Sequence, residues 1–388
     1  MPAFCSNFTN FFLTLLVITV GVYIAFQDPS VQPEYYEFPS PPKLEGPLSP
    51  NTRLRNAQYL LHGQIKGPES LLVENDIIYT GLWDGRIVKI ENGVITKEAR
   101  LIPKPNFNCD ASFDSEPICG RPLGLRRFDK DRFLVADAYL GLFLLNFETG
   151  KSEKILSSSE VVGGRNCTFL NDVEVLDKDT VIFSCSSSKW DRRRAFQALF
   201  EQRSDGRILK YSIPSKKLEV LADGLKFSNG VQLSKDKSTL FFSETGMARI
   251  WKLSLKSKDS KPSVFIKNLP GLPDNIRETS RGTFLVGLAG FRAEGSLALF
   301  DKLGSVPFIR KFLLSVLPNH VISTVLPNAQ PSYGFVVEFN EDGKIVDSFQ
   351  DPDGRSIGFV SEAVESNGYI YLGSFRAPYL AKVPKKGF

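Results

Sequence analysis

Five oxygen-bearing residues are spaced along the chain as if they shared one site: Glu69, Asn171, Asn229, Asp274 and Asn275. Measured in repeats of about 50 residues, the successive intervals are two repeats from Glu69 to Asn171, one from Asn171 to Asn229 and one from Asn229 to Asn275. A ring of such repeats brings equivalent positions together around its axis. Carboxylate and amide oxygens without sulfur or imidazole suit a hard cation, so we predict that these five residues bind one calcium ion.

The surroundings of these residues support a buried site. Each lies in a short apolar phrase, such as Phe-Leu-Asn-Asp-Val at 169–173, which indicates a strand that faces inward. A buried polar side chain is costly unless it is paired or bound to metal. Any one of these residues alone could simply cap its own turn, and it is the repeat spacing of the set that favours a metal.

The residues for acid–base chemistry are less evident. The two histidines, His62 and His320, lie outside these phrases, and no nucleophile elbow, metalloprotease motif or phosphate loop is present. We predict Asp172 and Glu362 as candidate catalytic carboxylates, because a carboxylate held ionised near a metal can activate water. The alternative is that Asp172 orients the metal ligands and Glu362 is a strand residue.

Short apolar runs that end in small or polar residues recur along the chain and predict strands. They lie at 77–81, 133–137, 181–184, 240–243, 283–287 and 369–373. Six strand-only units predict an all-β fold, a six-bladed β-propeller over residues 59–388. Two insertions, 190–205 and 292–333, interrupt the pattern. Helical spacing at 306–317 predicts a helix that packs on the domain, covers the channel mouth or touches the membrane surface.

The N-terminal region differs in composition from the rest. Residues 1–27 contain no charged side chain, and 11–26 are almost continuously apolar. We predict a short cytoplasmic stub and a transmembrane signal-anchor helix over 1–27, with a cleaved signal peptide as the alternative. Proline is frequent in 28–50, so we predict that 28–58 form an extended stalk between membrane and domain.

Cysteines and a glycosylation sequon indicate the compartment. Cys109 and Cys119 bracket a short polar loop, as in a disulfide, although these two, Cys167 and Cys185 could equally be reduced buried thiols. Asn166-Cys167-Thr168 predicts a glycan on Asn166. With the anchor, these features predict a single-pass type II membrane protein whose ectodomain is lumenal or extracellular, in the plasma membrane or endoplasmic reticulum.

Charge gives little further information about partners. The net charge of +5 comes from well-mixed signs, and basic runs lack the interleaved aromatics of a nucleic-acid-binding surface. We therefore expect the N-terminal helix to bind a membrane, and we expect no nucleic-acid partner. The sequence carries no signal for an oligomeric state.

Several phrases resemble the strictosidine-synthase-like family. They are Gly67–Leu71, Cys119–Gly124, Ala136–Leu142, Asn171–Val173, Phe227–Val231, Leu272–Arg277 and Tyr371–Phe375. The resemblance covers the anchor and nearly everything from residue 60 onward, and it implies a six-bladed propeller. Its looser kin include paraoxonases, which are calcium-dependent esterases and lactonases. The resemblance therefore implies a type II membrane glycoprotein with arylesterase-like activity, and a disulfide between Cys109 and Cys119.

Departures from the paraoxonase pattern limit what is carried over. The five ligand types are all kept, but Ser70 stands where an acidic residue would help to hold a second calcium, so we expect one ion. The histidine dyad has no counterpart, and neither Glu362 nor Glu365 aligns clearly with the catalytic glutamate of strictosidine synthase. We predict a calcium-dependent hydrolase of small esters or lactones. The alternative is a non-catalytic, calcium-stabilised propeller that binds a protein or lipid partner.

Overall fold

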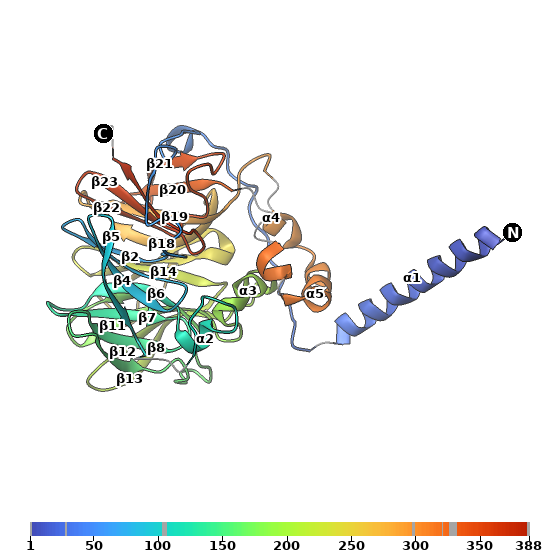
Figure 1. The fold of residues 1–388 in the computed structure, drawn as a ribbon, viewed down its shortest axis with the longest axis horizontal. Helices are drawn as coiled ribbons and strands as arrows, with labels where there is room; N and C mark the ends of the chain where they lie inside the picture. The colour runs from blue at the N-terminus through green and yellow to red at the C-terminus, as the bar shows by residue number, and fades with distance from the viewer. Residues whose placement is uncertain are drawn as a thin grey trace.

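Short strands and tight turns fold this chain into six four-stranded antiparallel sheets. The computed structural model describes residues 2–27, 29–102, 107–296, 299–319, 321–325 and 332–385. The sheets surround a common axis as the blades of a propeller (Figure 1). The predicted all-β, six-bladed propeller is confirmed.

Five blades are continuous in the chain, and the sixth joins both ends of it. The continuous blades are β2–β5 (Leu71–Glu74, Ile77–Gly81, Arg86–Glu91, Val94–Arg100), β6–β9 (Pro122–Arg127, Arg132–Asp137, Gly141–Asn146, Lys151–Leu156), β10–β13 (Phe169–Val175, Thr180–Ser187, Gly206–Ser212, Lys217–Leu225), β14–β17 (Ser228–Leu233, Thr239–Glu244, Arg249–Ser254, Ser263–Ile266) and β18–β21 (Gly271–Glu278, Phe284–Phe291, Gly334–Phe339, Ile345–Asp351). The last contains β22 (Glu362–Ser366), β23 (Tyr369–Gly373), β24 (Leu380–Pro384) and β1 (Gln58–Leu60). Pairing of β1 with β24 closes the ring.

The predicted apolar runs all fall in the second strand of a blade, namely β3, β7, β11, β15, β19 and β23. These strands are apolar because their side chains fill the space between neighbouring blades, where they are almost wholly buried. The first strands lie closer to the axis. Each contacts the first strand of the next blade, in the closed order β2, β6, β10, β14, β18, β22 and back to β2.

The described helices are α1 (Pro2–Gln27), α2 (Glu116–Cys119), α3 (Ala195–Glu201), α4 (Leu299–Leu303) and α5 (Pro307–Val316), with short 3-10 helices η1 (Gly46–Leu48), η2 (Arg192–Arg194) and η3 (Thr245–Met247) and a short π-helix η4 (Val321–Val325). Of these, α3, α4 and α5 lie between the propeller and α1 (Figure 1). The helix predicted within 306–317 is α5. It contacts α1, α3 and α4 and buries Arg310 and Leu314, so it packs on the domain.

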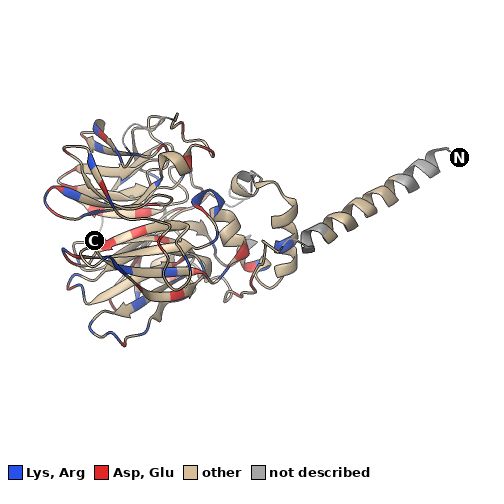
Figure 2. Ribbon diagram, turned by 90° about the horizontal axis from the view of Figure 1, so that it is seen from below, with Lys and Arg blue, Asp and Glu red and all other residues tan. Residues whose placement is uncertain are grey.

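The described part of α1 is uncharged (Figure 2) and exposes many apolar side chains, among them Phe11, Leu16 and Val17. Within the part of the chain that the structure describes, no helix meets the length and hydropathy needed to cross a membrane.

The proline-rich segment that follows α1 is extended, with only η1 as regular structure before β1. Its first part packs against α4 and α5, and residues 48–54 hydrogen-bond to β21, so the segment does not stand apart from the domain. Val31 and Tyr36 are buried, and the Tyr36 hydroxyl donates to the Phe300 carbonyl at 2.7 Å. The Arg310 guanidinium donates to the carbonyls of Glu34 and Phe200. Proline content predicted the extended backbone but carried no information about this docking.

Two disulfides link neighbouring segments. Cys109–Cys119 closes the predicted loop. Cys167–Cys185 joins the segment before β10 to β11, so the reading of these cysteines as free thiols is wrong.

A buried cluster of charges joins the inner strands at the axis. The Arg277 guanidinium of β18 donates to both carboxylate oxygens of Asp172 in β10, at 2.8 and 3.1 Å. It also donates to Glu362, the first residue of β22. The carboxylates of Asp172 and Glu362 are fully buried.

The remaining three inner strands complete this cluster. Arg126 of β6 lies 3.6 Å from the Asp172 carboxylate, and the Val231 amide of β14 donates to it at 3.0 Å. The Leu71 amide of β2 donates to Glu362 at 2.8 Å. All six blades therefore contribute a charge or an amide to one axial cluster. We call it the axial hub.

Replacing Arg277 with Met should destabilise the propeller by about 3–5 kcal/mol, because two buried carboxylates lose their shared cation. The loss should grow as the pH rises from 5 to 8, since unpaired buried carboxyls are held protonated in the fold and ionise in the unfolded chain. Chemical denaturation at several pH values measures this. The exposed Arg355→Met variant is the control and should change stability by less than about 1 kcal/mol. Equal losses in both variants would contradict a structural role for the hub.

Candidate metal centre

The inner strands of three successive blades carry β-bulges where ligands were predicted. Strand pairing shifts register around residues 171–172 in β10, 229–230 in β14 and 274–275 in β18. A bulge places two residues opposite one on the partner strand and redirects their side chains. Successive polar residues can therefore face different parts of the channel.

Close packing of the inner strands explains why glycine follows Asn229 in β14. A Cβ on Gly230 would lie 2.5 Å from Cα of Asn275 and 2.6 Å from the Asp274 carbonyl oxygen. Only glycine fits at this distance. The close approach brings Asn229 of one blade next to Asp274 and Asn275 of the next.

The five predicted ligands are all buried, with at most 5% of any of them exposed. Within the described residues, Oδ1 of Asn171, Asn229, Asp274 and Asn275 has no hydrogen-bond partner. Buried polar atoms are rarely left in this state. These four buried oxygens without hydrogen-bond partners, which we call bare, come from three neighbouring strands and are available to bind a cation.

Two of the amides are oriented by hydroxyl groups. Nδ2 of Asn171 donates to Ser186 Oγ at 3.0 Å, and Nδ2 of Asn229 donates to Thr245 Oγ1 at 3.1 Å. Because each nitrogen is held in this way, each Oδ1 is left for another ligand.

Asp274 has no ion-pair partner among the described salt bridges, although the residue is buried. Burial raises the pKa of this carboxyl well above its usual range, and the negative charges of Glu69 and Asp172 add to the effect. An ionised Asp274 therefore needs a cation beside it.

Glu69 faces a partner that the sequence analysis missed. Arg121 is fully buried, and its Nη2 donates to Glu69 Oε2 at 3.0 Å and to the Gly67 carbonyl at 2.8 Å. Burial raises the pKa of Glu69, and the Arg121 charge opposes that rise. Arg121 lies near the middle of the double interval between Glu69 and Asn171. The blade between those of Glu69 and Asn171 has its equivalent position near residue 120, so the repeat spacing could have predicted Arg121 as a member of the site.

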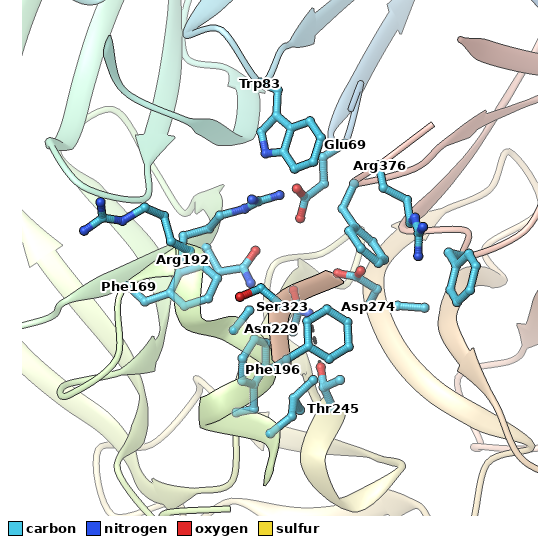
Figure 3. A pocket seen from close by; sticks show the side chains of 18 of the residues that line it. Glu69, Trp83, Phe169, Arg192, Phe196, Asn229, Thr245, Asp274, Ser323 and Arg376 are labelled. Atoms are coloured by element: carbon cyan, nitrogen blue, oxygen red, sulfur yellow. Dashed lines mark hydrogen bonds between the residues drawn. The ribbon is translucent and has the colours of Figure 1, made fainter. Parts of the chain in front are cut away.

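A cavity of about 390 Å³ opens onto these groups. Glu69, Asn171, Asn229 and Asp274 line it, while Asn275 does not. Figure 3 shows Glu69, Asn229 and Asp274 directed toward one space. The rest of the lining is mainly aromatic or basic: Trp83, Phe113, Phe169, Phe196, Phe227, Phe359 and Phe375, with Lys66, Arg192, Arg193 and Arg376.

The two predicted catalytic carboxylates lie in the axial hub, and neither lines the cavity. Burial acts to raise the pKa of Asp172, but the Arg277 and Arg126 charges outweigh it and hold that pKa below its ordinary value. Burial raises the pKa of Glu362 despite Arg277. This geometry favours a positioning role for both residues, and their role as general bases stays a prediction.

The other predicted residues lie outside the cavity. His62 is exposed and stacks on Tyr379, and His320 lies outside the described residues. Asn166 is half-buried, and its backbone carbonyl accepts a hydrogen bond from Arg207 at 2.7 Å. Glycosylation of Asn166 stays a prediction.

The residues fit one calcium ion. Glu69 and Asp274 supply charge, and Asn171, Asn229 and Asn275 supply amide oxygens, which leaves coordination positions for water or a ligand. The part of the chain that the structure describes contains no cluster of three or more His, Cys, Asp or Glu side chains suited to a metal. The candidate site therefore depends on amide oxygens.

The fold and this polar centre define a strictosidine synthase-like propeller. The family model described as strictosidine synthase matches residues 171–258, and that of the strictosidine synthase-like N-terminal region matches 46–90. The first match begins at Asn171.

The chain belongs to the family of adipocyte plasma membrane-associated proteins. It is 39% identical to the Salmo salar member over 97% of this chain and 92% of the relative. It is 37% identical to the Homo sapiens member over 98% and 90%. Drosophila melanogaster Hemomucin is 32% identical over 97% of this chain and 68% of its own length.

Solved structures share the fold at low identity. A gluconolactonase from Xanthomonas campestris superposes with a TM-score of 0.54 at 14% identity, covering 91% of this chain and 98% of its own. Regucalcin from Agrobacterium tumefaciens, described as a calcium-binding protein, superposes with a TM-score of 0.53 at 13% identity, covering 84% and 92%. At these identities the likeness shows the fold alone.

Replacing Asp274 with Asn should remove the need for a cation while it keeps the shape of the side chain. With chelator, we expect the variant to be at least as stable as wild type, because a buried carboxylate without a counter-ion is gone. Calcium at about 100 times its Kd should stabilise wild type by about 2.7 kcal/mol and the variant much less. Denaturation with EDTA or calcium measures both. Asp259→Asn, at an exposed position, is the control, and an equal calcium gain in all three proteins would contradict the site.

Proposed function

We propose that this protein is a calcium-dependent hydrolase of small aryl esters or lactones. The observation that carries the proposal is the set of four bare, buried oxygens, three of which belong to side chains that line an aromatic cavity. An apolar pocket with a few convergent polar groups is the usual form of a small-molecule site.

The side chains of the cavity have distinct parts in such a reaction. The aromatic rings bind the apolar part of the substrate and exclude water. Glu69 and Asp274 supply the negative charge of the metal site, and Ser186 and Thr245 orient its amides. When bound, calcium supplies a Lewis acid that polarises a carbonyl and stabilises the oxyanion.

The reaction also needs a proton acceptor. A calcium site lowers the pKa of bound water less than a zinc site does, so a base is still required. We propose Asp172 and Glu362 as the general bases for that step. Both accept hydrogen bonds from Arg277, and neither lines the cavity. Similarity to proteins described as a gluconolactonase and a calcium-binding regucalcin supports the reaction class and the ion.

Aryl-acetate hydrolysis by the full-length protein in detergent tests this function. We expect turnover in calcium, loss of turnover in EDTA and recovery on calcium addition. Asn229→Ala should lower kcat/KM at least about tenfold, since even outer-shell partners of a metal contribute that much. Asn340→Ala, in a surface turn, is the matched control and should keep full activity.

Two results would count against the hydrolase. Turnover that survives both EDTA and Asn229→Ala would remove calcium from the reaction. Stabilisation by calcium without turnover of any aryl ester or lactone would favour the non-catalytic propeller, whose ion joins blades while its surface binds a partner.

We also propose that α1 anchors the protein as a single-pass type II membrane protein, with the propeller in the lumen or outside the cell. The helix has 26 residues and no charged side chain, and a bilayer needs about 20 apolar residues in a helix. Relatives named as plasma membrane-associated support the assignment. The two disulfides suit an oxidising compartment.

Alkaline carbonate extraction of cell membranes tests the anchor. The full-length chain should remain in the membrane pellet, and a variant without residues 2–27 should not. An endoglycosidase should reduce the mass of the membrane-bound protein but not that of Asn166→Gln. Release of the full-length chain by carbonate would contradict the anchor, and an unchanged mass would contradict the lumenal glycan.

A further inference from the structure

One corner of the cavity combines an indole ring with an ammonium group. Lys66 precedes β2, and its carbonyl accepts the Trp83 amide at 3.0 Å. Its Nζ lies 3.9 Å from the centre of the Trp83 ring. Both residues line the cavity, and a cation over an indole is held in place without losing its charge.

Carboxylates already neutralise three other cations near this corner. Arg192 pairs with Glu116 at 3.2 Å, and Arg193 pairs with Asp191 at 2.8 Å. Arg121 pairs with Glu69 at 3.0 Å. Among the ion pairs of the described residues, none includes Lys66.

The corner therefore carries an excess of positive charge. Lys66 is an exposed residue of the cavity lining. Its partial desolvation lowers the pKa of its ammonium group, and repulsion by Arg192 and Arg121 adds to this effect while Glu116 opposes it. An incoming anion would relieve that repulsion.

We propose that the cavity binds an acidic amphiphile, in which an aryl or acyl body carries a carboxylate or phosphate group. The acidic group pairs with the Lys66 ammonium beside Trp83, and the apolar body lies among the phenylalanine rings. The position of Lys66 beside Trp83 therefore fixes the corner of the cavity in which the acidic group lies. As a substrate class this rests on the proposed hydrolase, whereas the binding preference does not require turnover.

Equilibrium binding of three naphthalene probes tests the preference. The probes are 2-naphthoate, 2-naphthyl phosphate and neutral 2-naphthol, titrated by their fluorescence against the full-length, calcium-loaded protein in detergent. We expect wild type to bind at least one anion about tenfold more tightly than 2-naphthol, as one charge-assisted hydrogen bond allows. The two anions distinguish a carboxylate from a phosphate ligand.

Variants of Lys66 identify the residue responsible. Lys66→Gln should lose most of the anion preference and keep its affinity for 2-naphthol, and Lys66→Arg should keep the preference. Lys217→Gln, on the outer strand β13, is the control for net charge. Equal binding of charged and neutral probes by wild type would overturn the proposal, as would equal loss of both in Lys66→Gln.

The failure of this proposal is distinguishable from that of the proposed function. Anion preference through Lys66 without ester hydrolysis would support the ligand class and reject the hydrolase. Calcium-dependent hydrolysis without any anion preference would support the hydrolase and reject the ligand class.

Discussion

One guanidinium in the centre of the propeller determines how the inner strands are arranged. Arg277 binds Asp172 and Glu362, and these carboxylates accept backbone amides from β14 and β2. Charged groups buried this deeply are tolerated only when opposite charges pair with them. Because every blade contributes to the axial hub, a shift of any inner strand would leave a buried charge without its partner. This constraint fixes the height and rotation of the inner strands.

The bulges in β10, β14 and β18 divide the axis into two layers. Asn171 lines the cavity while its neighbour Asp172 belongs to the hub. In the hub, opposite charges satisfy one another. In the adjoining layer, amide and carboxylate oxygens are left bare. The same strands therefore provide the charge pairs of the hub and, one residue away, a set of oxygens that are available to bind a cation.

The cavity above these ligands combines aromatic walls with basic groups. Part of its lining comes from α3 and η4, which lie in the two insertions. The segment after α1 packs against α4 and α5 of the same group of helices. Membership of the adipocyte plasma membrane-associated family does not by itself specify a ligand for this cavity, because one fold can serve different functions.

The sequence by itself determined the blade count and the second strand of every blade, because these depend on short-range apolar patterning and on a repeat of fixed length. It also indicated the Cys109–Cys119 disulfide and the residues of the candidate metal centre. It did not indicate that Asp172 and Glu362 share Arg277, that Arg121 holds Glu69, or that the segment after α1 packs on α4, α5 and β21. Those partners are 52 to 302 residues apart in the chain. Only tertiary structure decided them, because ring closure and strand bulges set which buried charges meet, and neither leaves a local pattern in the sequence.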